Sequence, residues 1–200
     1  TLLQRMIQTP SISGQEDAAC TLLAEWMTAE GCTPHRVGNN LWAEYGEGPQ
    51  TILLNAHIDT VKPASSYTRD PFGDECDGTT IYGLGANDAG RSVIAMLAVF
   101  MDVLHDPLPG KRLLLALTAE EENSGRNGIE LLLPHIGSID YAIVGEPTAL
   151  KMAVAERGLM VLDAEAHGIA GHAAREEGVN ALYIALDDIQ TLRQYAFDKV

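Results

Sequence analysis

Apolar residues in the first 60 positions change from a helical spacing to a strand-like one. In residues 15–30 they recur every three or four positions, and Gly31 is placed to end the helix that this spacing predicts. A shorter helix is predicted up to Ile7, because Thr9 and Pro10 stop it. Short runs of strand-forming residues follow at 41–45 and 51–56. The chain therefore opens with two helices and then enters a sheet.

A loop rich in Pro, Ser, Asp and Gly extends from Lys62 to Thr79, and beyond it helical and strand-like patterns alternate. Helices are predicted near 88–104 and 126–134, and apolar strands at 112–118 and 141–144. Strands that alternate with helices are typical of an α/β fold. We therefore expect a mostly parallel sheet covered by helices on both faces.

The pattern changes after Pro147. Strand-like stretches are predicted at 151–155 and 159–167, and a helix follows a Gly-rich turn at 177–195. This order indicates the start of a smaller α+β domain. We place the boundary near Arg157 and Gly158, which gives domains of residues 1–157 and 158–200.

The charge balance excludes some classes of partner. The chain has 13 Lys and Arg against 28 Asp and Glu, a formal net charge of -15, which repels nucleic acid and anionic lipid. The longest apolar stretches, 93–103 and 113–119, are shorter than the ~20 residues that cross a bilayer. The N-terminal residues carry no secretion signal, so we expect a cytoplasmic protein that binds neither nucleic acid nor membrane.

The cysteines do not indicate a disulfide framework. There are 3 of them, and none stands in a C-x-x-C spacing. An odd number without that spacing also argues against a structural zinc knuckle. We therefore expect free thiols.

Acids and a histidine stand where three predicted strands end. His57 and Asp59 follow the strand 51–56, the triplet Glu120–Glu122 follows 112–118, and Glu146 follows 141–144. The carboxyl edge of an open α/β sheet is where such folds build their sites. A neutral imidazole can bind zinc while a nearby carboxylate orients it, although a lone His at a strand end can equally be solvated or satisfied in the core.

A further acid, Asp88, follows the glycine turn at Gly83 and Gly85, where it could either cap a helix or bridge two cations. Adjacent carboxylates beside a buried strand repel one another unless cations or protons relieve them. A set of His, Asp and Glu suits zinc better than calcium, and cobalt or manganese accept similar donors. The sequence therefore predicts a metal site rather than a purely structural cluster.

Five segments in chain order resemble the M20 metallopeptidase family, which includes acetylornithine deacetylase, succinyl-diaminopimelate desuccinylase, aminoacylase and glutamate carboxypeptidases. They are NAHIDTV, GLGANDAG, TAEEENSG, VGEPT and GIAGHAAREEGVNAL. The resemblance implies two zinc ions held by four ligands, His57, Asp88, Glu122 and Glu146. Of these, His57 and Glu146 would bind one ion, Glu122 the other, and Asp88 both.

The resemblance also implies catalytic roles. Asp59 would orient His57, and Glu121 would act as the general base. The choice of Glu121 depends on matching the family's D-E-E triplet to Glu120–Glu122, so a shift of one residue would change it. His172 would reach the site of a partner subunit and help to hold the oxyanion.

The activity that the resemblance implies is hydrolysis of an N-acyl amino acid, most similar to acetylornithine deacetylase in the segments AEEENSG and VGEPT. A dipeptidase or carboxypeptidase with the same metal pair, and a non-catalytic binding protein on the same scaffold, are the alternatives. Family chains run beyond 300 residues and supply a last zinc-binding His after the lid domain. We therefore expect this sequence to be part of a longer enzyme, with a lid domain that forms a homodimer.

Overall fold

The computed structural model describes residues 1–155, 158, 161–172, 174–175 and 177–195. The chain divides into two compact units, residues 1–152 and 153–200. The expected boundary residue Arg157 lies outside the described residues. Among those that are described, no helix combines the length and the apolar character needed to span a membrane.

Among the described residues, all five strands and most of the helices lie in the first unit. The helices are α1 (Leu2–Ile7), α2 (Asp17–Ala29), α3 (Arg91–His105) and α4 (Ile129–Ile136), with a π-helical turn η1 (Ala86–Gly90) before α3. The strands are β1 (His35–Val37), β2 (Asn40–Tyr45), β3 (Gln50–His57), β4 (Lys111–Thr118) and β5 (Tyr141–Val144). The predicted helices and strands of residues 1–144 are present, and β1 is an addition.

The strands form one sheet in the order β1-β2-β4-β3-β5. β3 lies between β4 and β5 and is parallel to both, with His57 opposite Thr118. β2 is antiparallel to β1 and to β4, so four strands run in one direction and β2 runs against them. The expected mostly parallel sheet is confirmed. The direction of β2 is not visible in its apolar pattern.

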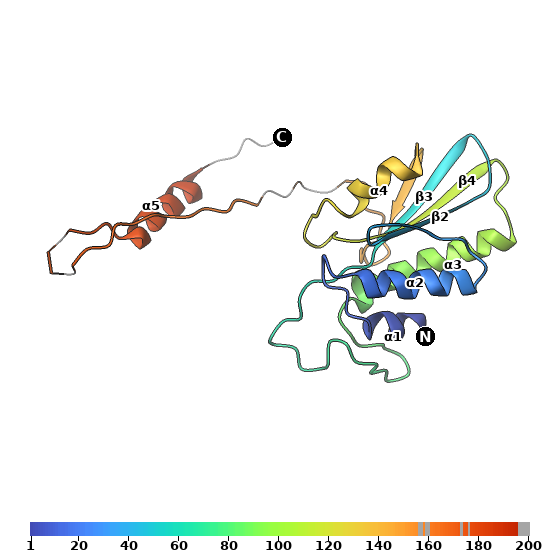
Figure 1. Ribbon diagram of the computed structural model, residues 1–200, viewed down its shortest axis with the longest axis horizontal. Coiled ribbons are helices and arrows are strands. Elements are labelled where there is room, and N and C mark those ends of the chain that lie inside the picture. The colour runs from blue at the N-terminus through green and yellow to red at the C-terminus, as the bar shows by residue number, and fades with distance from the viewer. Residues whose placement is uncertain (156–157, 159–160, 173, 176, 196–200) are drawn as a thin grey trace. The chain divides into compact units, whose positions relative to one another are not determined.

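Helices cover both faces of the sheet, as Figure 1 shows for α2 and α3 on one face and α4 on the other. β4 is covered on both sides, and because successive side chains of a strand point to opposite faces, its residues join two cores in turn. Leu113, Leu115 and Leu117 join the core with α2 and α3. Leu114 and Ala116 join the smaller core with α4. This double coverage fixes the strand ends that carry the candidate site.

The two neighbouring leucines of α4 provide a test of this packing. Leu132 is fully buried against the sheet, whereas Leu133 is 44% exposed. We expect Leu132→Ala to lower the free energy of unfolding by about 2–5 kcal/mol, because it removes buried methyl groups and leaves a cavity. Leu133→Ala should change it by less than about 1 kcal/mol. Urea denaturation compares the two, and equal losses would contradict the placement of α4.

In the second unit the main element is α5 (Ala181–Gln194). It starts after Asn180, whose side chain accepts a hydrogen bond from the Leu182 amide, so the helix begins four residues later than the predicted position 177. The strands predicted at 151–155 and 159–167 are wrong where the structure describes them: residues 151–155 and 161–167 are in no strand. Their apolar side chains, such as Val154 at 84% exposure, have strand propensity but no partner strand among the described residues.

Candidate metal centre

The carboxyl ends of three adjacent parallel strands meet at one edge of the sheet. His57 is the last residue of β3, and Glu121 and Glu122 follow β4 closely. Glu146 follows β5, and Asp88 comes from η1 just before α3. The fold therefore brings together all six site residues predicted in the first unit. For five of the six the signal was a His or an acid soon after an apolar run, and for Asp88 it was the preceding glycine turn.

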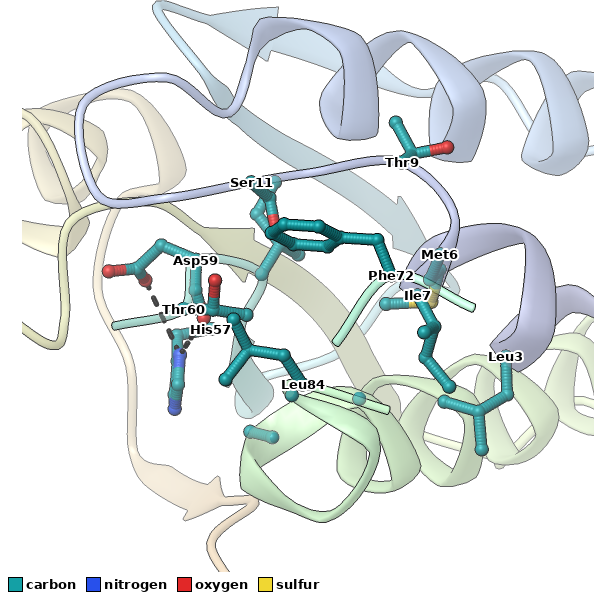
Figure 2. Close-up of a pocket in the computed structure, with 14 residues that line it drawn as sticks. Leu3, Met6, Ile7, Thr9, Ser11, His57, Asp59, Thr60, Phe72 and Leu84 are labelled. Carbon is teal, nitrogen blue, oxygen red and sulfur yellow. Dashed lines mark hydrogen bonds and ion pairs between the residues drawn. The ribbon is translucent and has the colours of Figure 1, made fainter. Parts of the chain in front are cut away.

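The deepest part of the centre is the pair of His57 and Asp59, whose side chains are 1% and 0% exposed. Nδ1 of His57 lies 3.1 Å from the backbone oxygen of Asp59 and 3.3 Å from its Oδ1, and Figure 2 shows the ring beside this carboxylate. Nδ1 therefore donates its hydrogen to Asp59. Once Nε2 gives up its proton, its lone pair can bind a metal ion, and the bond to Asp59 fixes the orientation of the ring.

Nε2 of His57 faces a group of carboxylates. It lies 3.1 Å from Oδ1 of Asp88, 3.8 Å from Oε2 of Glu121 and 3.9 Å from Oε2 of Glu146. Ligand atoms of His57, Asp88 and Glu122 all lie within 4.8 Å of one another. Neither η1 nor α3 has a side-chain cap at its start, so the alternative in which Asp88 caps a helix is wrong.

The charges of this group favour a bound cation. Burial and the nearby charge of Asp88 raise the pKa of Glu122. Burial raises the pKa of Glu146 as well, and although His57 lowers it, the charges of Glu121 and Asp88 add to the rise. Carboxylates that repel one another in this way are stabilised by a divalent ion. One imidazole nitrogen and several carboxylate oxygens are a donor set that fits zinc.

The protonation of His57 in the metal-free protein gives a pH prediction. Burial lowers its pKa, but the Asp59 hydrogen bond and charge, with Glu146 and Glu121, raise it more, to about 9. A raised pKa stabilises the fold fully below the unfolded value of about 6.5, and this stabilisation is lost as the pH rises through about 9. We expect the imidazole NMR signals to titrate near pH 9 without metal. A midpoint near 6.5 would contradict the proposed surroundings.

Glu120 and Glu121, two of the three acids after β4, have different surroundings. Glu120 has a φ of 54°, and its carboxylate accepts hydrogen bonds from the amide and side chain of Asn127. It is thereby tied into its own loop. Glu121 instead places Oε2 3.8 Å from the His57 ring. This arrangement favours Glu121 over Glu120 as the group that meets substrate.

Sequence reasoning missed three polar residues beside the centre. The Ser13 hydroxyl donates to Oδ2 of Asp59 at 2.7 Å. Glu16 and Asn40 are both 0% exposed. Their residue types are typical of surface positions, so nothing in the sequence indicated that they are buried.

His172, the remaining predicted site residue, lies in the second unit. Its Nδ1 accepts a hydrogen bond from the amide of Ala174 at 3.2 Å. Its role toward the metal centre remains a prediction.

The chain is similar in sequence or in fold to several known proteins. Succinyl-diaminopimelate desuccinylase of Paracoccus denitrificans is 37% identical, over 86% of this chain and 50% of its own length, so the chain spans about half of this curated relative. A tripeptidase structure from Staphylococcus aureus has a TM-score of 0.62 at 23% identity, covering 94% of this chain and 54% of that one. A dinuclear metal binding peptidase of the M20 family from Bacillus subtilis has a TM-score of 0.54 at 16% identity, covering 72% and 40%.

The family assignment comes from the sequence itself. A profile of peptidase family M20/M25/M40 matches residues 53–191, which is more than half of the chain and includes every residue of the centre described above. The chain therefore belongs to peptidase family M20/M25/M40.

Proposed function

We propose that this chain carries the main part of the active centre of a metal-dependent amidohydrolase that cleaves N-acyl amino acids. The observation that supports it most is the meeting of one imidazole and several carboxylates at the carboxyl ends of β3, β4 and β5. The proposed ligands are His57, Asp88, Glu122 and Glu146. The proposed metal is zinc. Two ions per site are proposed because the Bacillus subtilis peptidase that shares this fold is described as dinuclear metal binding.

The side chains divide the work of hydrolysis among them. Two divalent ions held here would polarise the amide carbonyl and lower the pKa of a water molecule. Glu121 accepts the proton of the attacking water and returns it to the departing amine. Asp59 keeps Nδ1 of His57 protonated, so that Nε2 stays available as a ligand. The half-exposed carboxylate of Glu121 can reach substrate from its place beside the His57 ring.

The identity of the acyl group on the substrate is a second, more specific proposal. The matching segments resemble acetylornithine deacetylase, whereas the curated relative that we compared is a succinyl-diaminopimelate desuccinylase. At 37% identity that relative gives N-succinyl amino acids the first place among candidate substrates. N-acetylornithine comes second.

A homodimer through the second unit is also proposed. Along α5 the side chains of Leu182, Leu186 and Ile189 are 62%, 46% and 51% exposed, and their spacing places them along one stripe of the helix. Such a stripe in contact with a second copy would be buried. The proposal includes His172 as a residue that assists the site of the partner subunit.

A substrate panel tests the function. The protein at its full natural length, loaded with zinc, should hydrolyse N-succinyl amino acids or N-acetylornithine faster than unmodified dipeptides. Removal of zinc with a chelator should abolish turnover, and added zinc or cobalt should restore it. Hydrolysis of dipeptides alone would favour a dipeptidase, and the absence of any turnover with metal bound would favour a binding protein.

A further inference from the structure

Four consecutive backbone amides after β4 are all bound by side chains. The amide of Ala119 donates to Oδ1 of Asn40 at 2.9 Å, and that of Glu120 donates to Oε1 of Glu16 at 3.4 Å. The next two amides, of Glu121 and Glu122, donate to the two carboxylate oxygens of Asp59 at 3.0 and 3.1 Å. We call residues 119–122, held in this way, the amide cradle.

The acceptors of the amide cradle are themselves fixed and buried. Ser13 donates to Oδ2 of Asp59 at 2.7 Å, and Asn39 donates to Oε2 of Glu16 at 2.9 Å. The Asn40 amide group donates to the backbone oxygens of Val37 and Asn127 at 3.0 and 2.7 Å. Asp59, Glu16 and Asn40 are each at most 1% exposed. Buried acceptors with all their partners in place hold a backbone rigidly.

The segment 11–16 is joined to the strand end from which Asp59 projects. Ser13 N donates to the oxygen of Thr60 at 3.2 Å, and Thr60 N donates to the oxygen of Ser11 at 2.9 Å. Figure 2 shows Ser11 next to Asp59 and Thr60. The N-terminal segment is therefore built into the centre and is more than a connection between α1 and α2.

We propose that Ser13, Glu16 and Asn40 are positioning residues that use the amide cradle to set Glu121 and Glu122 against His57. The inference rests on the proposed function. Without side-chain acceptors, the amides after β4 would be free to turn, and Glu121 and Glu122 would lose their fixed separation. Partners of this outer kind typically contribute 10–100-fold to metal affinity or activity.

Ser13→Ala is the central variant, because it removes one hydroxyl and leaves Asp59 in place. In the protein at its full natural length we expect cobalt binding weaker by about 10-fold, and kcat lower by a similar factor with little change in KM. Amide hydrogen exchange in the peptide that covers residues 119–124 should become faster. Ser13→Thr, which keeps a hydroxyl, should restore cobalt binding, kcat and slow exchange. Thr28→Ala removes an exposed hydroxyl that is bonded to a backbone oxygen in α2, and it is the matched control. It should leave cobalt binding, kcat and exchange unchanged.

Glu16→Ala tests the other end of the cradle, because it removes the oxygen that accepts from the Glu120 amide, and we expect faster exchange of the same peptide. Unchanged exchange and cobalt affinity in both Ser13→Ala and Glu16→Ala would overturn the inference. If Ser13→Ala unfolds the protein, Ser13→Thr decides, because recovery of exchange protection by the hydroxyl alone supports positioning and its absence contradicts it. Failure of the unaltered protein to bind cobalt would contradict the proposed function instead, and the exchange measurements would still decide the role of the cradle.

Discussion

Replacing Glu121 by Gln is expected to lower kcat by about 1000-fold while metal binding is retained. Gln has nearly the same shape as Glu but cannot accept the proton of the attacking water, and a positioned general base typically contributes 100- to 10,000-fold. Oε2 of Glu121 lies 3.8 Å from Nε2 of His57, and the side chain is 54% exposed, so it can meet a substrate. Steady-state kinetics and zinc titration of the same preparation measure the two effects.

Glu120→Gln is the matched control for this prediction. The Glu120 carboxylate accepts hydrogen bonds from Asn127, and the amide oxygen of Gln can accept from the same backbone group. We therefore expect kcat to stay within about 5-fold of the unaltered enzyme, since no reacting group is lost. A large loss in Glu120→Gln together with normal turnover in Glu121→Gln would show that the general base is Glu120 and that the match to the family triplet is wrong by one residue.

His57→Ala is expected to weaken zinc binding by at least about 100-fold and to destabilise the metal-free fold. Both members of the His57–Asp59 pair are buried, at 1% and 0% side-chain exposure. Removing one partner of a buried pair leaves a desolvated charge, which typically costs about 3–5 kcal/mol. The bonds that Asp59 receives from Ser13, Glu121 and Glu122 should keep the loss near the lower limit. Calorimetric zinc titration and chemical denaturation measure the two effects.

His105→Ala separates this effect from the general loss of an imidazole. His105 stands at the end of α3, is exposed, and bonds only the backbone oxygen of Met101 among the described residues. Its removal should leave zinc affinity unchanged and alter the free energy of unfolding by less than about 1 kcal/mol. If His57→Ala bound zinc as tightly as His105→Ala, His57 would not be a ligand.

The sequence predicted the parts of the fold that depend on local pattern. Apolar runs located β3, β4 and β5, and the acids or His beyond each run identified the edge at which the centre forms. The three-residue strand β1 was missed, because His35–Val37 is too short and too polar to show an alternation. The strands predicted at 151–155 and 159–167 failed for the opposite reason, since their composition favours strands while pairing depends on residues elsewhere.

The candidate site was predicted less completely than the fold. Residues that bind a metal stand out because several acids and a His share one sheet edge. Residues that only position other residues do not stand out, because the sequence does not show whether a polar residue such as Glu16 or Asn40 is buried. Their value appears only when β2, α2 and the loop after β4 are brought together in space.

The strand order has a consequence for how the protein folds. Among the described strands, only β1 and β2 pair across a short connection, residues 38–39, whereas residues 58–110 separate β3 from its partner β4 and still more of the chain separates the other pairs. Contacts between distant segments slow folding, because a long loop must lose conformational entropy before the contacts that stabilise it can form. On the ribosome, His57 is made early, yet the carboxylates of Glu121 and Glu146 that face it follow only when residues up to 121 and then 146 have been made. The sheet edge that carries the candidate metal centre is thus among the last parts of the first unit to acquire its structure.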